Sequence, residues 1–115
     1  MIYEDLRPIT REEYERLFRL GPAEEAGEAL LRLAWHEAET SSAERECVAA
    51  LSDTREQVRK AAVIGLGHLA RRQKALSAAT LIRLRALKKD PEMAGCIEDT
   101  LNDVEVFGRL FEGAE

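Results

Sequence analysis

The sequence predicts an all-α protein, an α-solenoid of about three antiparallel helix pairs in a single domain over residues 1–115. Its composition supports helices, because Ala, Leu, Glu and Arg dominate a chain of 115 residues that is 45% hydrophobic and only 5% aromatic. Apolar residues recur at helical spacing along residues 53–72. The same apolar row returns 35 residues later, and a repeat of this length is typical of stacked helical hairpins.

The helix predicted over residues 53–72 is the centre of this pattern. Thr54 stands at the expected N-cap, and Gln57 completes a capping box. Ala61 and Gly65 are small enough to let a neighbouring helix approach closely. The two apolar rows are Val58, Ala62, Leu66 and Leu69, and then Met93, Ile97, Leu101 and Val104.

The other elements follow from capping signals taken in chain order. Residues 1–9 are expected to form an extended leader. Thr10 should cap a first helix that ends near Leu20, and Gly21-Pro22 should separate it from a second helix that ends near Glu37.

The third, fifth and sixth helices are predicted from similar signals. Ser41 should cap the third helix with Glu44 at the box position, Ser77 should cap the fifth, and Asp90-Pro91 should turn the chain into the sixth. The residues expected to face inward on the fifth helix are Leu81, Ile82, Leu84 and Leu87. The predicted pairs therefore span roughly 11–37, 42–72 and 77–107, and the tail residues Leu110 and Phe111 are expected to cover the last open face.

Composition limits the class of protein. No apolar run approaches the roughly 18 residues of a membrane span, and residues 1–10 are acidic and lack the apolar core of a signal peptide. We therefore expect a cytoplasmic protein. Cys47 and Cys96 have no partners at metal-ligand spacing, so we expect core thiols, with neither a disulfide nor a metal site, and no cofactor.

Charge is divided unevenly along the chain. Residues 1–54 carry 6 basic and 13 acidic residues, residues 55–89 carry 10 basic and 1 acidic, and residues 90–115 carry 1 basic and 8 acidic. Net charges of −7, +9 and −7 give the overall −5. A basic band thus lies between two acidic ends, and only part of it is explained by cations that close helices.

Residues 53–66 resemble the second helix of a HEAT repeat, in which an Asp turn precedes Val-Arg and a row of small residues and Leu. Asp53, Val58-Arg59, Ala62 and Leu66 match that pattern. Residues 90–94 are similar, but Ala94 stands where the family has Arg, and the first pair lacks the motif. The resemblance implies a HEAT-like solenoid, a right-handed superhelix whose second helices line a concave binding surface. A small acidic protein of this kind is similar to adaptors and to bacterial immunity proteins that neutralise a cognate toxin.

The expected binding surface is the side of the second helices turned away from their buried rows. Its residues are Glu28, Arg32, Trp35, His36, Lys60, Ile64, His68, Arg71, Asp99, Asn102 and Asp103. Trp35 and Ile64 are large apolar groups on a face that should be exposed to solvent, which is typical of interface anchors. Alternatively, Trp35 packs under the leader or a neighbouring helix. A His36-His68-Asp103 row could in principle bind zinc, but adjacent helix axes are about 8–10 Å apart and no ligand pair occupies one helix.

Enzymatic chemistry is not expected. Gly65-Leu66-Gly67 lacks the Lys-Ser/Thr of a phosphate loop, and no His is placed to activate either Cys. Two binding functions remain. The first is a protein partner, such as a basic toxin domain attracted by the acidic ends. The alternative is nucleic-acid backbone binding by the band over 55–89, through Arg59, Lys60, Arg71, Arg72, Lys74, Arg83 and Arg85. Against the alternative, the pI of 5.2 is far below that of most such domains. The chain should be a monomer or a weak homo-oligomer, in which the basic band meets an acidic end.

Overall fold

A computed structural model describes residues 6–73 and 75–102, and within these ranges the protein is all-α with no strand. This confirms the predicted all-α class. The helices are α1 (Arg11–Leu20), α2 (Ala23–His36), α3 (Thr40–Ala50), α4 (Glu56–Gln73) and α5 (Ala78–Leu87). Residues 94–102 are also helical and are called the C-terminal helical segment.

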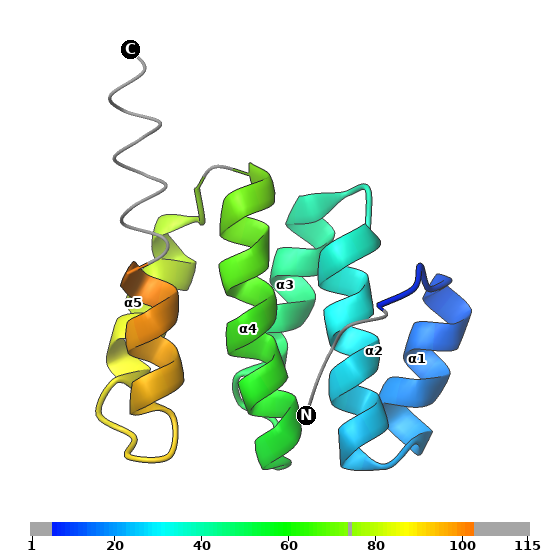
Figure 1. Cartoon of the computed structure of the whole chain (residues 1–115), viewed down its shortest axis with the longest axis horizontal. Helices are drawn as coiled ribbons and strands as arrows, with labels where there is room; N and C mark the ends of the chain where they lie inside the picture. Colours follow the sequence, from blue (N-terminus) through cyan, green and yellow to red (C-terminus); the bar gives the residue numbers. More distant parts are fainter. Residues whose placement is uncertain (1–5, 74, 103–115) are drawn as a thin grey trace.

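The second helices form one row. Figure 1 shows α2, α4 and the C-terminal helical segment side by side facing the viewer, with α3 and α5 behind them and α1 beside α2. Among α1 to α5, the most extensive packing is between α2 and α4. The row of second helices therefore presents one continuous face, and α4 lies at its centre.

The buried rows predicted from the sequence form the core. Val58, Ala62, Leu66 and Leu69 on α4 are fully buried, as are Met93 and Ile97, and Leu101 is buried as well. Val104 lies outside the described residues.

Small residues set the distance between helices, as predicted for Ala61 and Gly65. A Cβ atom added at Gly65 would lie 3.0 Å from the Cys47 sulfur and 3.3 Å from the Ala34 Cβ. A Cβ added at Gly27 would lie 3.3 Å from the Cβ of Ala61. Glycine is therefore what allows α4 to pack so closely against α2 and α3.

Two of the predicted caps are confirmed, and two are wrong. Thr10 Oγ1 accepts from Glu13 N at 3.1 Å, and Ser77 Oγ accepts from Thr80 N at 3.2 Å. Ser41, by contrast, lies inside α3, and α4 begins at Glu56 rather than after Thr54. The reason for the late start of α4 is Asp53, whose Oδ1 accepts from Arg55 N at 2.9 Å and forms a turn ahead of the helix.

Glu44 joins three elements instead of completing a capping box. It is only 9% exposed. Its carboxylate accepts from Gln73 Nε2 at 2.9 Å, from Ser77 N at 3.2 Å and from Thr80 Oγ1 at 2.5 Å. Burial opposes ionisation of Glu44, but these donors outweigh it and lower its pKa. An ionised carboxylate therefore ties α3 to the end of α4 and the start of α5.

The inward face of α5 was predicted too broadly. Leu84 is fully buried and Leu81 and Leu87 are half-buried, but Ile82 is 67% exposed. Ile82 lies two residues before Leu84, which is a rotation of about 200° around the helix. Because Leu84 points into the core, Ile82 points away from it. The tail residues Leu110 and Phe111, which were predicted to cover the last open face, lie outside the described residues.

Candidate functional site

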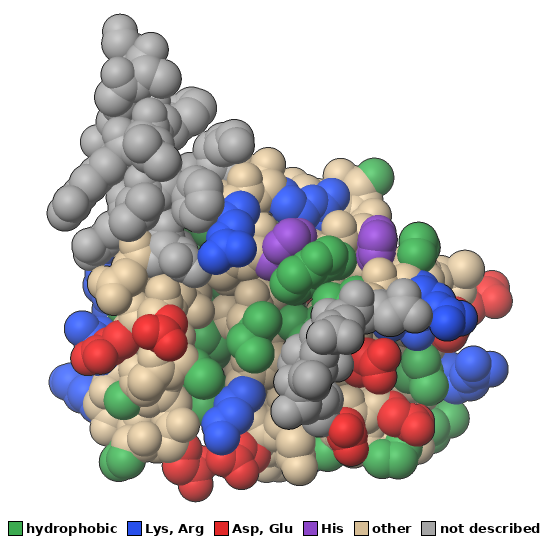
Figure 2. Space-filling view, in the orientation of Figure 1, with side chains coloured by type: hydrophobic (Ala, Val, Ile, Leu, Met, Phe, Trp, Pro, Cys, Tyr) green, Lys and Arg blue, Asp and Glu red, His purple; other side chains and the backbone are tan. Residues whose placement is uncertain are grey.

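A cavity on the face of the second helices brings together residues from α2, α4 and the C-terminal helical segment. We call it the Trp35 cavity; its volume is about 240 Å³, and it is lined by Trp35, Ile64, Gly67, His68, Arg71, Cys96, Asp99 and Thr100. Five of these residues were predicted for the binding surface, namely Trp35, Ile64, His68, Arg71 and Asp99. Figure 2 shows hydrophobic side chains and both histidines gathered on this face.

Trp35 forms one wall of the cavity by packing on a neighbouring helix, as the alternative interpretation of this residue expected. Its ring stacks on His68 of α4, with centroids 3.5 Å apart and an angle of 4° between the planes. The pKa of His68 is lowered, first by burial and then by the positive charges of Arg72, Arg71 and His36. His68 is therefore uncharged near neutral pH, and the stacked pair is an aromatic surface rather than a cationic one.

Ile64 and Cys96 extend this wall with apolar atoms. Ile64 is 39% exposed, although it lies on the central helix of the molecule. Cys96 was predicted to be a core thiol, but it is half-buried and lines the cavity. Cys47, in contrast, is fully buried as predicted, and burial raises the pKa of its thiol. The cavity thus exposes an isoleucine side chain and a thiol beside the aromatic pair.

The floor of the cavity is formed where α4 meets the C-terminal helical segment. Thr100 Oγ1 donates to the carbonyl of Val63 at 3.4 Å. A Cβ atom added at Gly67 would lie 3.5 Å from Thr100 Oγ1, which is an ordinary contact distance. An alanine therefore fits at position 67 without a clash, and its methyl group would occupy part of the floor. Thr100 was missed by the sequence reasoning, although its position next to Asp99 could have indicated it.

Two predicted surface residues contact the chain's own leader. Arg32 donates to the carbonyls of Arg7 and Pro8, both at 2.9 Å, and His36 Nε2 donates to the carbonyl of Leu6 at 2.7 Å. We call this region the leader patch. Arg32 and His36 thus bind the backbone of residues 6–8, and Arg32 also pairs with Glu13 at 3.5 Å.

The remaining predicted residues lie apart from the Trp35 cavity. Glu28 lines a separate hollow with Arg7, Glu13 and Arg32. Lys60 pairs with Glu56 at 2.9 Å on its own helix. Asn102 lines a hollow at the end of the row, together with Arg85, Lys88, Glu98 and Leu101.

The spacing of His36, His68 and Asp103 in the sequence argued against a zinc site, and Asp103 lies outside the described residues. Over residues 6–73 and 75–102, no group of three His, Cys, Asp or Glu side chains is placed to hold a metal ion.

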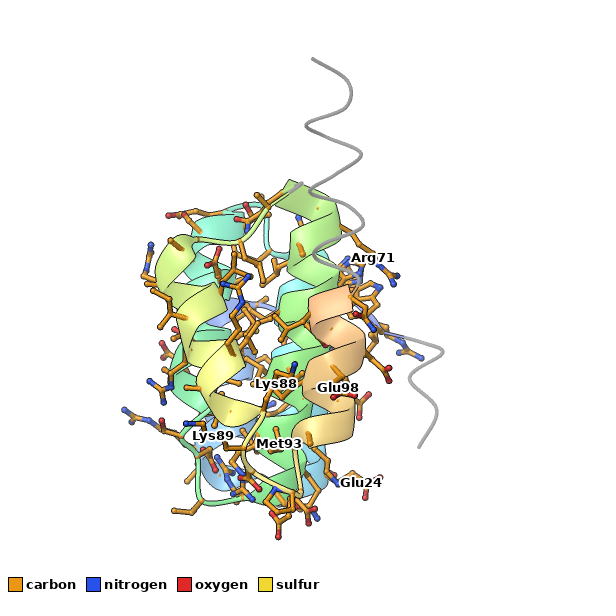
Figure 3. The ribbon with its side chains drawn as sticks, turned by 90° about the vertical axis from the view of Figure 1, so that its left-hand side faces the viewer. Glu24, Arg71, Lys88, Lys89, Met93 and Glu98 are labelled. Atoms are coloured by element: carbon orange, nitrogen blue, oxygen red, sulfur yellow. The ribbon has the colours of Figure 1, made fainter. Side chains whose placement is uncertain are left out.

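The basic band does not form one surface. Arg55 pairs with Asp53 at 2.9 Å, Arg59 with Glu92 at 3.1 Å, and Arg72 donates to the carbonyl of Ala34 at 2.9 Å. In Figure 3, Arg71 lies on the right-hand side, whereas Lys89 lies at the lower left, near the end of α5. The positive charges are therefore distributed over different sides of the molecule, and many are engaged within it.

Comparisons with known proteins do not place the chain in a family. No protein-family model matches it, and neither does any curated protein or solved structure. Every helix in the described part of the chain is too short or too polar to cross a lipid bilayer.

Proposed function

We propose that this protein is a non-enzymatic protein-binding module, a HEAT-like α-solenoid that binds another protein on the face formed by α2, α4 and the C-terminal helical segment. The Trp35 cavity is the observation that carries the proposal. It combines a stacked Trp35–His68 pair with the exposed side chain of Ile64. Tryptophan and its apolar neighbours supply much of the binding energy of protein interfaces, because they bury large areas with few rotatable bonds.

The size and lining of the cavity favour a protein side chain over a small molecule. Its volume is about 240 Å³, below the roughly 300–1,000 Å³ that is usual for small-molecule sites. Apart from His68, the polar side chains in its lining are those of Arg71, Asp99 and Thr100, and the Thr100 hydroxyl is engaged with the carbonyl of Val63. A single apolar side chain fits such a hollow, while the surrounding helices supply the rest of the contact.

The biological role that we propose is that of an adaptor or an immunity protein neutralising a cognate bacterial toxin in the cytoplasm. Support comes from the resemblance of residues 53–66 to a HEAT repeat and from the net charge of −5. A negative protein associates rapidly with a basic partner, because long-range attraction raises the encounter rate.

A bait experiment with a matched pair of variants tests the proposal. Gly67→Ala places a methyl group on the cavity floor, whereas Gly95→Ala makes the same change at an exposed position with nothing within 4 Å. A polypeptide from cells that carry the gene should be retained by the wild type and by Gly95→Ala, and lost with Gly67→Ala. Equal recovery on all three baits would show that the cavity is not the binding site.

Nucleic-acid backbone binding by the band over 55–89 is the alternative, and it has less support. Arg85 and Lys88 lie together in one hollow, but Glu98 lines the same hollow and opposes phosphate. A gel-shift assay at low salt separates the two functions, since retardation of DNA or RNA at micromolar protein would favour the alternative.

A further inference from the structure

We propose that the partner segment that enters the Trp35 cavity carries a basic side chain, Arg or Lys, next to the apolar side chain that it inserts. This inference rests on the proposed function and adds the chemistry of the partner to it. The apolar group would pack against Trp35 and Ile64, and the cation would pair with Asp99 at the edge of the cavity.

The positive groups around the cavity are already engaged within the chain. Arg72 donates to the carbonyl of Ala34 at 2.9 Å. Arg71 also has an interaction within the chain, and His68 is uncharged because its pKa is lowered. An acidic partner residue would therefore have to compete for cations that have other contacts.

Asp99 is different, because its side chain forms no ion pair or hydrogen bond with any residue in the described ranges. Its carboxylate is exposed and lines the cavity. Figure 2 shows acidic side chains on the left, over the C-terminal helical segment. The charge that a partner can complement at this edge is thus negative, which favours a cation.

The positions of these groups also give the orientation of the partner. Burial first, and then Arg72, Arg71 and His36, lower the pKa of His68, so the basic groups of the chain lie at the His68 end of the cavity. Asp99 lies on the C-terminal helical segment, three residues beyond Cys96 and therefore close to it on one side of that helix. The partner's cation should consequently point toward the C-terminal helical segment, and its apolar side chain toward α2.

Selection from a library of random phage-displayed peptides tests this inference. Wild-type protein should enrich peptides in which Arg or Lys lies within one helical turn of an aliphatic or aromatic residue. Selected peptides are then synthesised and titrated by intrinsic fluorescence, which reports on the cavity because Trp35 is the single tryptophan.

A charge reversal and its matched control locate the effect. Asp99→Lys should weaken binding of the selected peptides by about fivefold or more, as expected from losing an exposed ion pair and adding repulsion. Glu24→Lys changes the net charge equally at an exposed position, at the lower end of the molecule and away from Arg71 in Figure 3. It should leave the affinity within about twofold, since screening weakens attraction beyond about 10 Å.

The outcomes separate the two proposals. Enrichment of acidic peptides, or equal weakening by Asp99→Lys and Glu24→Lys, would overturn the basic partner but leave the cavity as a binding site. Peptides that bind Gly67→Ala as well as they bind Gly95→Ala would overturn the cavity itself, and the proposed function with it.

Discussion

The Trp35 cavity and the leader patch lie next to each other on α2, but their α2 residues have different partners. In the leader patch, Arg32 and His36 donate to backbone carbonyls of residues 6–8. Trp35 instead stacks on His68 of α4 and forms the wall of an open cavity. Helical spacing can place these residues on one face, but it cannot tell which part of that face the chain covers with its own leader.

The difference follows from the directions of the side chains. Arg32 and His36 are four residues apart, so they lie one above the other and reach the same segment of leader. Trp35 is rotated from Arg32 by about 60°, which turns it toward α4. A rotation of about 60° around α2 thus separates the residues that are bonded to the leader from the residue that lines the cavity.

Disrupting the close approach of α4 to α2 and α3 should damage both regions. Gly65→Val would place a branched side chain at a position where even an added Cβ atom would lie only 3.0 Å from the Cys47 sulfur. We expect a loss of about 3 kcal/mol in the free energy of unfolding, measured by urea denaturation. The control, Gly95→Val, is exposed with nothing within 4 Å and should be nearly neutral. Similar unfolding midpoints for the two variants would contradict tight packing at Gly65.

Removing the charge of Glu44 should affect the cavity side more than the leader patch. Glu44→Gln replaces one carboxylate oxygen by an NH2 group, which faces donors of Gln73, Ser77 and Thr80 and cannot accept from them. The free energy of unfolding should fall by about 2 kcal/mol. The carboxylate holds α5, which lies behind the C-terminal helical segment in Figure 1. Hydrogen exchange should therefore increase most in residues 78–102 and least in α1.

The pH dependence of stability gives a second measurement for Glu44. The pKa of Glu44 is lower in the folded protein than its ordinary value of 4.5. Its contribution to stability is therefore present above that value and is lost as the pH falls through the folded pKa. The difference in unfolding free energy between wild type and Glu44→Gln should shrink at acidic pH. A constant difference would mean that Glu44 is not ionised in the fold.

Releasing the leader should leave the cavity intact. Arg32→Met keeps an apolar stem of similar length but removes the donors to the carbonyls of Arg7 and Pro8. We expect a loss of about 1 kcal/mol and faster hydrogen exchange at residues 6–10. Peptide binding measured by Trp35 fluorescence should not change. Weaker binding would show that the leader patch belongs to the binding surface, as the sequence predicted.

The smallest expected effect is a spectral one. The pKa of His68 lies below its ordinary value of 6.5, so Trp35 fluorescence should change with a midpoint below that pH as the stacked ring becomes charged. Because the pKa of His68 is lower in the folded protein, the fold favours the neutral ring. The contribution of neutral His68 to the free energy of unfolding is therefore fully present above pH 6.5 and is lost as the pH falls through the folded pKa. His68→Gln should abolish the fluorescence transition, whereas His36→Gln should keep it. A transition that survives in His68→Gln would have another origin.

The sequence by itself determined the all-α class, the buried rows and the caps at Thr10 and Ser77, because these depend on spacing and on local hydrogen bonds. It also identified Trp35, Ile64, His68, Arg71 and Asp99 as residues of one face. It failed where a distant partner decides the role of a residue. Glu44 looked like a local cap, but its partners are Gln73, Ser77 and Thr80.

Tertiary structure alone decided which charged groups of the predicted surface are bonded within the chain. Arg32 and Asp99 are both charged residues of the predicted surface, yet one is bonded to the leader and the other has no ion pair in the described ranges. The Trp35–His68 stack joins residues that are 33 positions apart in the sequence. Periodicity fixes the direction of a side chain on its own helix, but what that side chain meets depends on how the helices pack.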